Sequence, residues 1–145
     1  MNQIQEIYQK KFSDYQCAIH IRRGDYLKYP NHHPICSLNY YAQAIQYFDN
    51  STNFVIFSDD IDWCRHQDLF QEKRFDFWTS QRDDLDLYLM SIFPHQIIAN
   101  SSFSWWASWL NIYQNKKVIA PSLWFGQNLK HLNTEDIYAS YMLKI

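Results

Sequence analysis

The stretch Cys17-Ala18-Ile19-His20-Ile21-Arg22-Arg23-Gly24-Asp25-Tyr26 is the most informative part of the chain. Its first five residues form a short apolar run, which predicts a buried strand over Cys17–Ile21. Ligands of open α/β sheets bind at the carboxyl ends of such strands, and a guanidinium offers a fixed fork of donors that fits phosphate oxygens. Arg22 and Arg23 are therefore candidates for holding a phosphate. The alternative is that both arginines form surface ion pairs while Asp25 caps a turn, and this segment alone supports the two interpretations equally.

Apolar runs alternate along the chain with segments of helical spacing. The runs predict further strands at residues 53–57, 75–78, 95–99 and 117–120. The spacing predicts helices at residues 2–12, 39–48, 61–69 and 84–92, another from about 102 to 110, and a last one near 134–143. Strands that alternate with helices are typical of βαβ units with right-handed crossovers. We therefore predict an α/β fold over residues 1–145, with a Rossmann-like parallel sheet and flanking helices.

Polar side chains follow four of the predicted strands, at residues 20–25, 58–60, 78–80 and 100–104. Because the carboxyl ends of parallel strands meet at one edge of a sheet, we expect these clusters to converge on one site. Carboxylates are frequent among them, including Asp59 and Asp86. They are suited to a divalent cation or to the donors of a sugar or base, but a charge bias at helix N-termini is the simpler interpretation for most of them.

The second informative segment is Asn100-Ser101-Ser102-Phe103-Ser104-Trp105-Trp106. Hydroxyl groups and the free N–H groups of a helix that starts here would favour an anion. For Ser101 or Ser102 alone, an ordinary N-cap ahead of a Trp-rich core helix is the favoured interpretation. The phosphate interpretation gains if this segment lies beside the arginine pair. With only two glycines the chain has no Gly-rich phosphate loop, so a phosphate site must use side chains and helix N-termini.

Composition excludes several classes of protein. A net charge of −2 argues against a nucleic-acid partner, which needs a basic face. The three cysteines, Cys17, Cys36 and Cys64, form no disulfide framework and indicate a reducing compartment. The segment 32–36, His-His-Pro-Ile-Cys, lacks a second ligand cluster, so we expect no metal site. With no leader or long apolar run evident, we expect a cytoplasmic protein, with peripheral membrane association as an alternative.

At these residues the chain resembles the α-1,2-fucosyltransferases, the inverting enzymes of glycosyltransferase family 11. The resemblance covers about residues 16–125, in order and at family-like spacing. The matching segments are residues 20–27, His33 with residues 36–41 and 44–45, residues 56–61 with Trp63, residues 86–91, the long run of residues 95–111, residues 118–121 and Trp124-Phe125. The segments at 20–27 and 95–111 together are highly specific to this family.

The resemblance implies galactoside 2-α-L-fucosyltransferase activity: fucose passes from GDP-fucose to a galactose hydroxyl of a glycan acceptor, with inversion. It implies no cofactor besides the donor and no metal, because the arginines can relieve the charge of the departing diphosphate. It also implies one half of a two-domain GT-B fold. The matching motifs belong to the C-terminal, GDP-fucose-binding half, so we expect the N-terminal half to lie outside residues 1–145, with supply in trans as one possibility. A truncated, non-catalytic nucleotide-sugar-binding domain, or a subunit that needs a partner, is the alternative.

The resemblance also implies roles for individual residues. Arg22 or Arg23 should contact the β-phosphate, Asp86 should hold the guanine edge, and the loop of Ser101, Ser102 and Phe103 should lie beside the diphosphate. His20 either shapes the pocket or is a satisfied structural histidine. Asp25 and His33 are the candidates for the catalytic base. The full set of expected substrate-binding residues is His20, Arg22, Arg23, Asp59, Asp86, Asn100, Ser101, Ser102 and Phe103.

Overall fold

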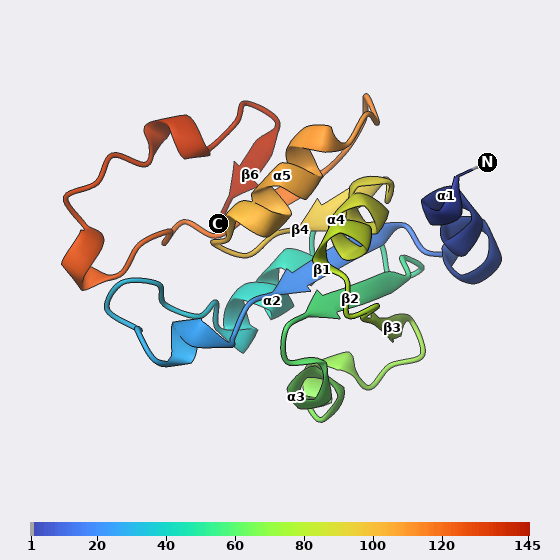
Figure 1. The fold of residues 1–145 in the computed structure, drawn as a ribbon, viewed down its shortest axis with the longest axis horizontal. Coiled ribbons are helices and arrows are strands. Elements are labelled where there is room, and N and C mark those ends of the chain that lie inside the picture. The colour runs from blue at the N-terminus through green and yellow to red at the C-terminus, as the bar shows by residue number, and fades with distance from the viewer. Residues whose placement is uncertain (1) are drawn as a thin grey trace.

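A computed structural model describes residues 2–145 as a parallel sheet with helices on both faces (Figure 1). Its strands are β1 (Cys17–Ile21), β2 (Phe54–Ser58), β3 (Phe75–Trp78), β4 (His95–Ile97), β5 (Val118–Ala120) and β6 (Met142–Lys144). They lie in the order β3-β2-β1-β4-β5-β6, and every neighbouring pair is parallel. The predicted α/β, Rossmann-like arrangement is confirmed.

The central strands are apolar on both faces because helices cover both sides of the sheet. Alternate residues of β1 face opposite ways: Cys17, Ile19 and Ile21 pack with helices α2 (Leu38–Ile45) and α3 (Ile61–Arg65). Ala18 faces the other side, which is covered by α1 (Gln3–Ile7), the π-helical turn Tyr8–Phe12, α4 (Asp83–Ser91) and α5 (Ser102–Leu110). Helices α4 and α5 lie together on this second face (Figure 1).

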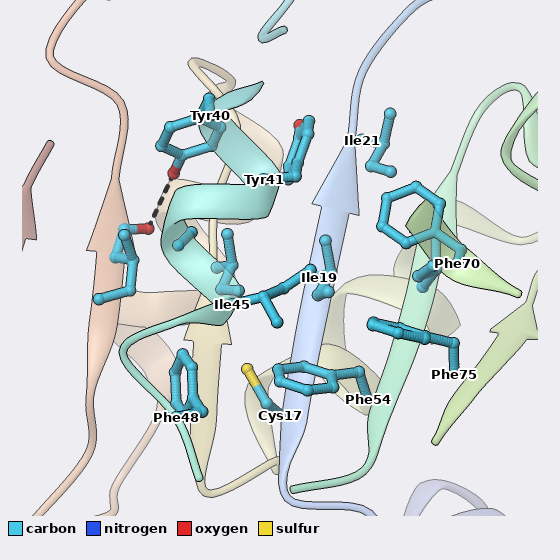
Figure 2. Packing of buried hydrophobic residues seen from close by; sticks show 14 of the residues in the cluster. Cys17, Ile19, Ile21, Tyr40, Tyr41, Ile45, Phe48, Phe54, Phe70 and Phe75 are labelled. Carbon is cyan, nitrogen blue, oxygen red and sulfur yellow. Dashed lines mark hydrogen bonds between the residues drawn. The ribbon is translucent and has the colours of Figure 1, made fainter. Parts of the chain in front are cut away.

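Two tyrosines on α2 tie the helix to the ends of the strands that carry the polar clusters. The buried hydroxyl of Tyr41 donates to the carbonyl oxygen of His20 at 2.8 Å. The hydroxyl of Tyr40 lies 2.7 Å from the carbonyl oxygen of Ile98 and 3.2 Å from that of Ile119, and Figure 2 draws the second of these contacts. Because these carbonyls follow or end strands, both tyrosines hold the carboxyl edge of the sheet in place.

Most predicted elements are found within two residues of their expected bounds, but three helices differ. The helix predicted at residues 39–48 ends at Ile45, three residues early. Residues 61–69 form only α3 and then a 3₁₀ turn, Asp68–Phe70. The predicted helix near 134–143 is wrong: the segment has a 3₁₀ turn at Glu135–Ile137 and then β6. Tertiary contacts override the local pattern here, because the indole N–H of Trp105 donates to the carbonyl oxygen of Ile137 at 2.7 Å and residues 142–144 pair with β5.

The topology has a switch point where β1 and β4 lie side by side. The chain leaves β1 toward β2 on one side and leaves β4 toward β5 on the other, so the connections diverge at their carboxyl ends. Such a switch point is where open α/β sheets bind ligands. Arg22 follows β1 directly, and the segment that opens α5 follows β4, so both informative segments reach the same edge.

Candidate functional site

A cavity of about 150 Å³ lies at the carboxyl edge of the sheet. Its walls come from the ends of β1, β2 and β3 and from the starts of α4 and α5. The lining residues are His20, Arg22, Phe57, Ser58, Asp59, Thr79, Gln81, Asp83, Asp86 and Phe103. The structure therefore brings together residues from all four predicted polar clusters or their immediate neighbours. Sequence reasoning did not single out Thr79 and Gln81, although they adjoin the expected strand end at residues 78–80.

Arg22 lies at the cavity and is held by two carboxylates. One terminal nitrogen donates to Oδ1 of Asp25 at 2.7 Å, and the other lies 3.5 Å from Oδ2 of Asp59. Burial lowers the pKa of Arg22, but the hydrogen bond to Asp25 and the charge of Asp59 outweigh it, so the net pKa is raised. A third of the side chain is exposed. The guanidinium is therefore fully charged and within reach of a ligand.

Arg23 is held more tightly and does not line the cavity. Its guanidinium lies 3.6 Å from the centre of the Trp63 ring, and its Nε donates to Oδ2 of Asp60 at 3.1 Å. Only 13% of the side chain is exposed. The two adjacent arginines therefore differ: the ion-pair interpretation describes Arg23 well, whereas Arg22 combines ion pairing with access to the cavity.

Asp59 joins the ends of β1 and β2. Its Oδ1 accepts from the backbone N–H of Arg23 at 2.9 Å, while Oδ2 faces Arg22. Gly24 leaves room for this carboxylate, because a Cβ on residue 24 would overlap Oδ2 of Asp59 and make the side chain shift. The carboxylate thus fixes both the backbone after β1 and the side chain of Arg22, and it also lines the cavity.

His20 is a neutral imidazole in the wall of the cavity. It is 4% exposed, its Nδ1 lies 2.9 Å from Oγ of Ser104, and its ring centre is 5.2 Å from that of Phe103. Burial, and then the positive charge of Arg22, lowers its pKa to about 3. The ring is therefore satisfied on one edge, and it also contributes to the cavity, so both interpretations of His20 apply.

Asp86 lies across the cavity on the first turn of α4. Its Oδ1 accepts three hydrogen bonds, from the indole N–H of Trp78 at 2.9 Å, the hydroxyl of Ser80 at 2.7 Å and the backbone N–H of Ser80 at 3.2 Å. Its Oδ2 has only a 3.4 Å contact with the same N–H. One carboxylate oxygen thus holds the loop between β3 and α4, and the second keeps most of its accepting capacity. In that loop Gln81 has φ of 62°, a left-handed conformation that is uncommon for a side chain of this kind.

The residues that open α5 divide between structural ties and the cavity. The amide of Asn100 donates to the carbonyl oxygens of Pro34 at 2.8 Å and Trp124 at 3.0 Å, so it joins three segments and does not line the cavity. Oγ of Ser101 accepts from the backbone N–H of Phe103, which makes Ser101 the predicted N-cap. Ser102 is exposed at the first helical position, and Phe103 alone of this group lines the cavity.

The two candidates for a catalytic base lie on the loop between β1 and α2. Asp25 has an exposed side chain, and its hydrogen bond to Arg22 lowers its pKa. His33 stacks on the ring of Tyr26, with ring centres 5.1 Å apart, and its ring centre is 6.1 Å from that of Phe125. Neither lines the cavity. The hydroxyl of Tyr26 donates to the carbonyl oxygen of Asn100 at 2.8 Å, which ties this loop to the start of α5.

Membrane-spanning helices and metal-binding clusters are both absent from residues 2–145. No helix in this part of the chain has the length and apolar character needed to cross a membrane. No group of three or more His, Cys, Asp or Glu side chains among these residues is arranged to hold a metal ion.

The low pKa of His20 predicts a pH-dependent stability. Below pH 6.5 the unfolded imidazole takes up a proton, whereas the folded one stays neutral down to about pH 3. The protein therefore takes up a proton when it unfolds in this window. The contribution of His20 to the free energy of unfolding is complete above pH 6.5 and is lost as the pH falls, by up to about 1.4 kcal/mol per pH unit. In urea unfolding, the free energy of unfolding should fall less steeply with decreasing pH for His20→Gln than for wild type. The exposed control His131→Gln should show the wild-type slope. Equal slopes for wild type and His20→Gln would contradict this account.

Comparisons with known proteins agree with the geometry. The family model described as Glycosyl transferase family 11 matches residues 2–141. The O-antigen biosynthesis glycosyltransferase WbnK of Escherichia coli is 35% identical over 127 residues, which cover 82% of this chain and 42% of that protein. The alpha-1,2-colitosyltransferase of Escherichia coli is 39% identical over 128 residues, covering 82% and 43%.

The chain spans less than half the length of these curated relatives. No solved structure matches it. The family match nevertheless extends over nearly all of the described residues, from the helix before β1 to the residue before β6. The chain therefore belongs to glycosyltransferase family 11.

Proposed function

We propose that this chain binds the nucleotide-sugar donor of a family 11 glycosyltransferase, with GDP-fucose as the donor. The observation that carries the proposal is the pairing of a charged, accessible Arg22 with a carboxylate oxygen of Asp86 that keeps free accepting capacity, both in one cavity at the switch point. On this view the sheet is the donor-binding half of a GT-B enzyme, and residues 1–145 form that one domain.

Asp86 suits the base of the donor. A carboxylate accepts from the two N–H donors on the Watson–Crick edge of guanine, and Oδ2 of Asp86 is free to do so while Oδ1 anchors the loop. A cavity of about 150 Å³ is smaller than typical ligand pockets of roughly 300–1,000 Å³, so it holds only part of the donor. We place the base near Asp86 and the diphosphate toward Arg22 and Phe103, with the sugar over the open rim.

Arg22 suits the diphosphate. Transfer of fucose breaks the bond between the sugar carbon and a β-phosphate oxygen, and negative charge grows on the departing diphosphate. A guanidinium already fixed beside it stabilises that charge, which in other enzymes is worth several kcal/mol for a single donor. We assign this contact to Arg22, and we assign Arg23 the role of a positioning residue that holds the end of β1 through Trp63 and Asp60.

The same contact offers a way to prepare a base. Asp25 now accepts a hydrogen bond from Arg22, which lowers its pKa. When a diphosphate takes over the guanidinium, the carboxylate loses this partner and regains its basicity, so it becomes able to accept the proton of the acceptor hydroxyl. His33 remains the second candidate for this role.

We base the proposed acceptor, sugar and partners on membership of the family. We propose a galactose hydroxyl of a glycan as the acceptor, transfer with inversion, and either a cytoplasmic or a peripheral membrane location. One relative is named for transferring colitose, so colitose is the second candidate sugar. Because the chain spans less than half of its relatives, the alternative function is a non-catalytic donor-binding domain or a subunit that needs a partner half.

Titration of the chain with GDP-fucose tests the proposed function. Calorimetry should show binding of GDP-fucose and GDP, much weaker binding of UDP, and the same affinities with a chelator present as without it. A radiolabel-transfer assay with a β-galactoside then distinguishes the two proposed functions. An enzyme transfers the labelled sugar, whereas a donor-binding domain binds the donor without transfer. Equal affinity for UDP, or binding that vanishes with the chelator and returns with Mg²⁺, would contradict the base and arginine assignments respectively.

Replacing Arg22 tests the phosphate contact separately from folding. Arg22→Ala should weaken GDP binding by roughly 10- to 100-fold, the range expected for hydrogen bonds to a charged group, and should leave GMP binding nearly unchanged because GMP lacks the β-phosphate. Arg65→Ala is the matched control, since Arg65 is a half-exposed arginine paired with Asp62 on α3. If Arg22→Ala weakened GDP and GMP equally, the assigned contact would be wrong.

A further inference from the structure

Ser104 is a fully buried serine on the first turn of α5 and lies directly behind His20. Its Oγ is 2.9 Å from Nδ1 of His20, and it accepts from the backbone N–H of Ala99 at 3.2 Å. Sequence reasoning placed Ser104 in the α5 segment but gave it no role. These contacts connect the end of β1, the second residue after β4 and the start of α5 through one hydroxyl group.

Counting protons decides which partner donates in the contact between Ser104 and His20. The hydroxyl of Ser104 has one proton, and its possible acceptors are Nδ1 of His20 at 2.9 Å and the carbonyl oxygens of Ala99 at 3.4 Å and Ser101 at 3.5 Å. Both carbonyls lie beyond the usual range of 2.5–3.0 Å for a hydroxyl donor. Nδ1 is thus the nearest acceptor for the hydroxyl proton, and the N–H of Ala99 occupies one of the two lone pairs of Oγ, so we take Ser104 as the donor and Nδ1 as unprotonated.

The other ring nitrogen of His20 opens to the cavity. Nε2 has no hydrogen-bond partner among residues 2–145. It is also not one of the fully buried side-chain atoms that lack a partner in this part of the chain, which belong to Arg74 and Gln96. His20 lines the cavity and its Nε2 is not among these buried atoms, so we infer that the Nε2 edge is the one reached from the cavity. We propose that Ser104 is a positioning residue that holds His20 as the Nε2–H tautomer and so aims a neutral donor at an anionic oxygen of the donor diphosphate.

This inference rests on the proposed function for its ligand, but its physical basis is independent of it. The imidazole is neutral at working pH, since burial and the nearby Arg22 lower its pKa to about 3. A neutral ring donates from one nitrogen only, so the tautomer decides whether the cavity receives a donor or an acceptor. An acceptor at Nε2 would repel phosphate oxygens, whereas a donor adds to the contact from Arg22.

Nitrogen NMR of the imidazole tests the tautomer without any ligand. The wild-type protein should show His20 protonated at Nε2 and unprotonated at Nδ1. In Ser104→Ala the spectrum should shift toward a mixture of tautomers, because Nδ1 loses its donor. Ser108→Ala is the matched control: Ser108 is equally buried on α5, and its hydroxyl contacts the carbonyl oxygen of Trp105 at 2.7 Å and the hydroxyl of Tyr141 at 3.2 Å.

GDP titration of the same variants tests the consequence. Ser104→Ala should bind GDP roughly tenfold more weakly than wild type, and Ser108→Ala should bind it as wild type does. A wild-type His20 protonated at Nδ1 overturns the inference even if Ser104→Ala fails to fold. If wild type binds GDP and a folded Ser104→Ala variant binds it equally well, the inference about Ser104 is overturned while the proposed function stands. Absence of GDP binding by wild type overturns the proposed function and the phosphate role together, whereas the tautomer is still measured.

Discussion

The site depends on one hydrogen bond, which the backbone N–H of Arg23 donates to the carboxylate of Asp59. It joins the ends of β1 and β2 at the carboxyl edge, where the parallel register places them side by side. A glycine at position 24 leaves room for the carboxylate, whose second oxygen faces Arg22. The position of the cavity arginine therefore follows from the strand register and from one side chain that bridges two strand ends.

The site balances its positive charges internally. Asp25 and Asp59 hold Arg22, and Asp60 holds Arg23. A diphosphate must displace at least Asp25 to reach Arg22, so part of the attraction between arginine and phosphate is offset by the lost ion pair. That pair is exposed on the Asp25 side, and exposed ion pairs contribute only about 0–1 kcal/mol, so the exchange is inexpensive. The half-buried contact with Asp59 can persist and keep the guanidinium aimed at the cavity.

The fold was largely predictable because the local sequence patterns for strands and helices match the observed elements along most of the chain. The apolar run of β1 and the serine cap of α5 were found at their predicted positions. Residues 134–143 were not, since Ile137, Tyr138, Tyr141 and Met142 have helical spacing but are held by Trp105 and by pairing with β5. Sequence reasoning also could not separate Arg22 from Arg23, because the side chain that captures Arg23 is Trp63, forty residues further along the chain. Asn100, for its part, had no sequence signal for its ties to Pro34 and Trp124.

The central claim is that one cavity at this edge receives both the base and the diphosphate of the donor. An experimental structure of the chain with GDP bound tests it most directly. The account predicts guanine against Oδ2 of Asp86 and the guanidinium of Arg22 turned from Asp25 to the β-phosphate. GDP bound elsewhere, for example at the opposite edge of the sheet beside His95 and Lys117, with Arg22 still on Asp25, would contradict it.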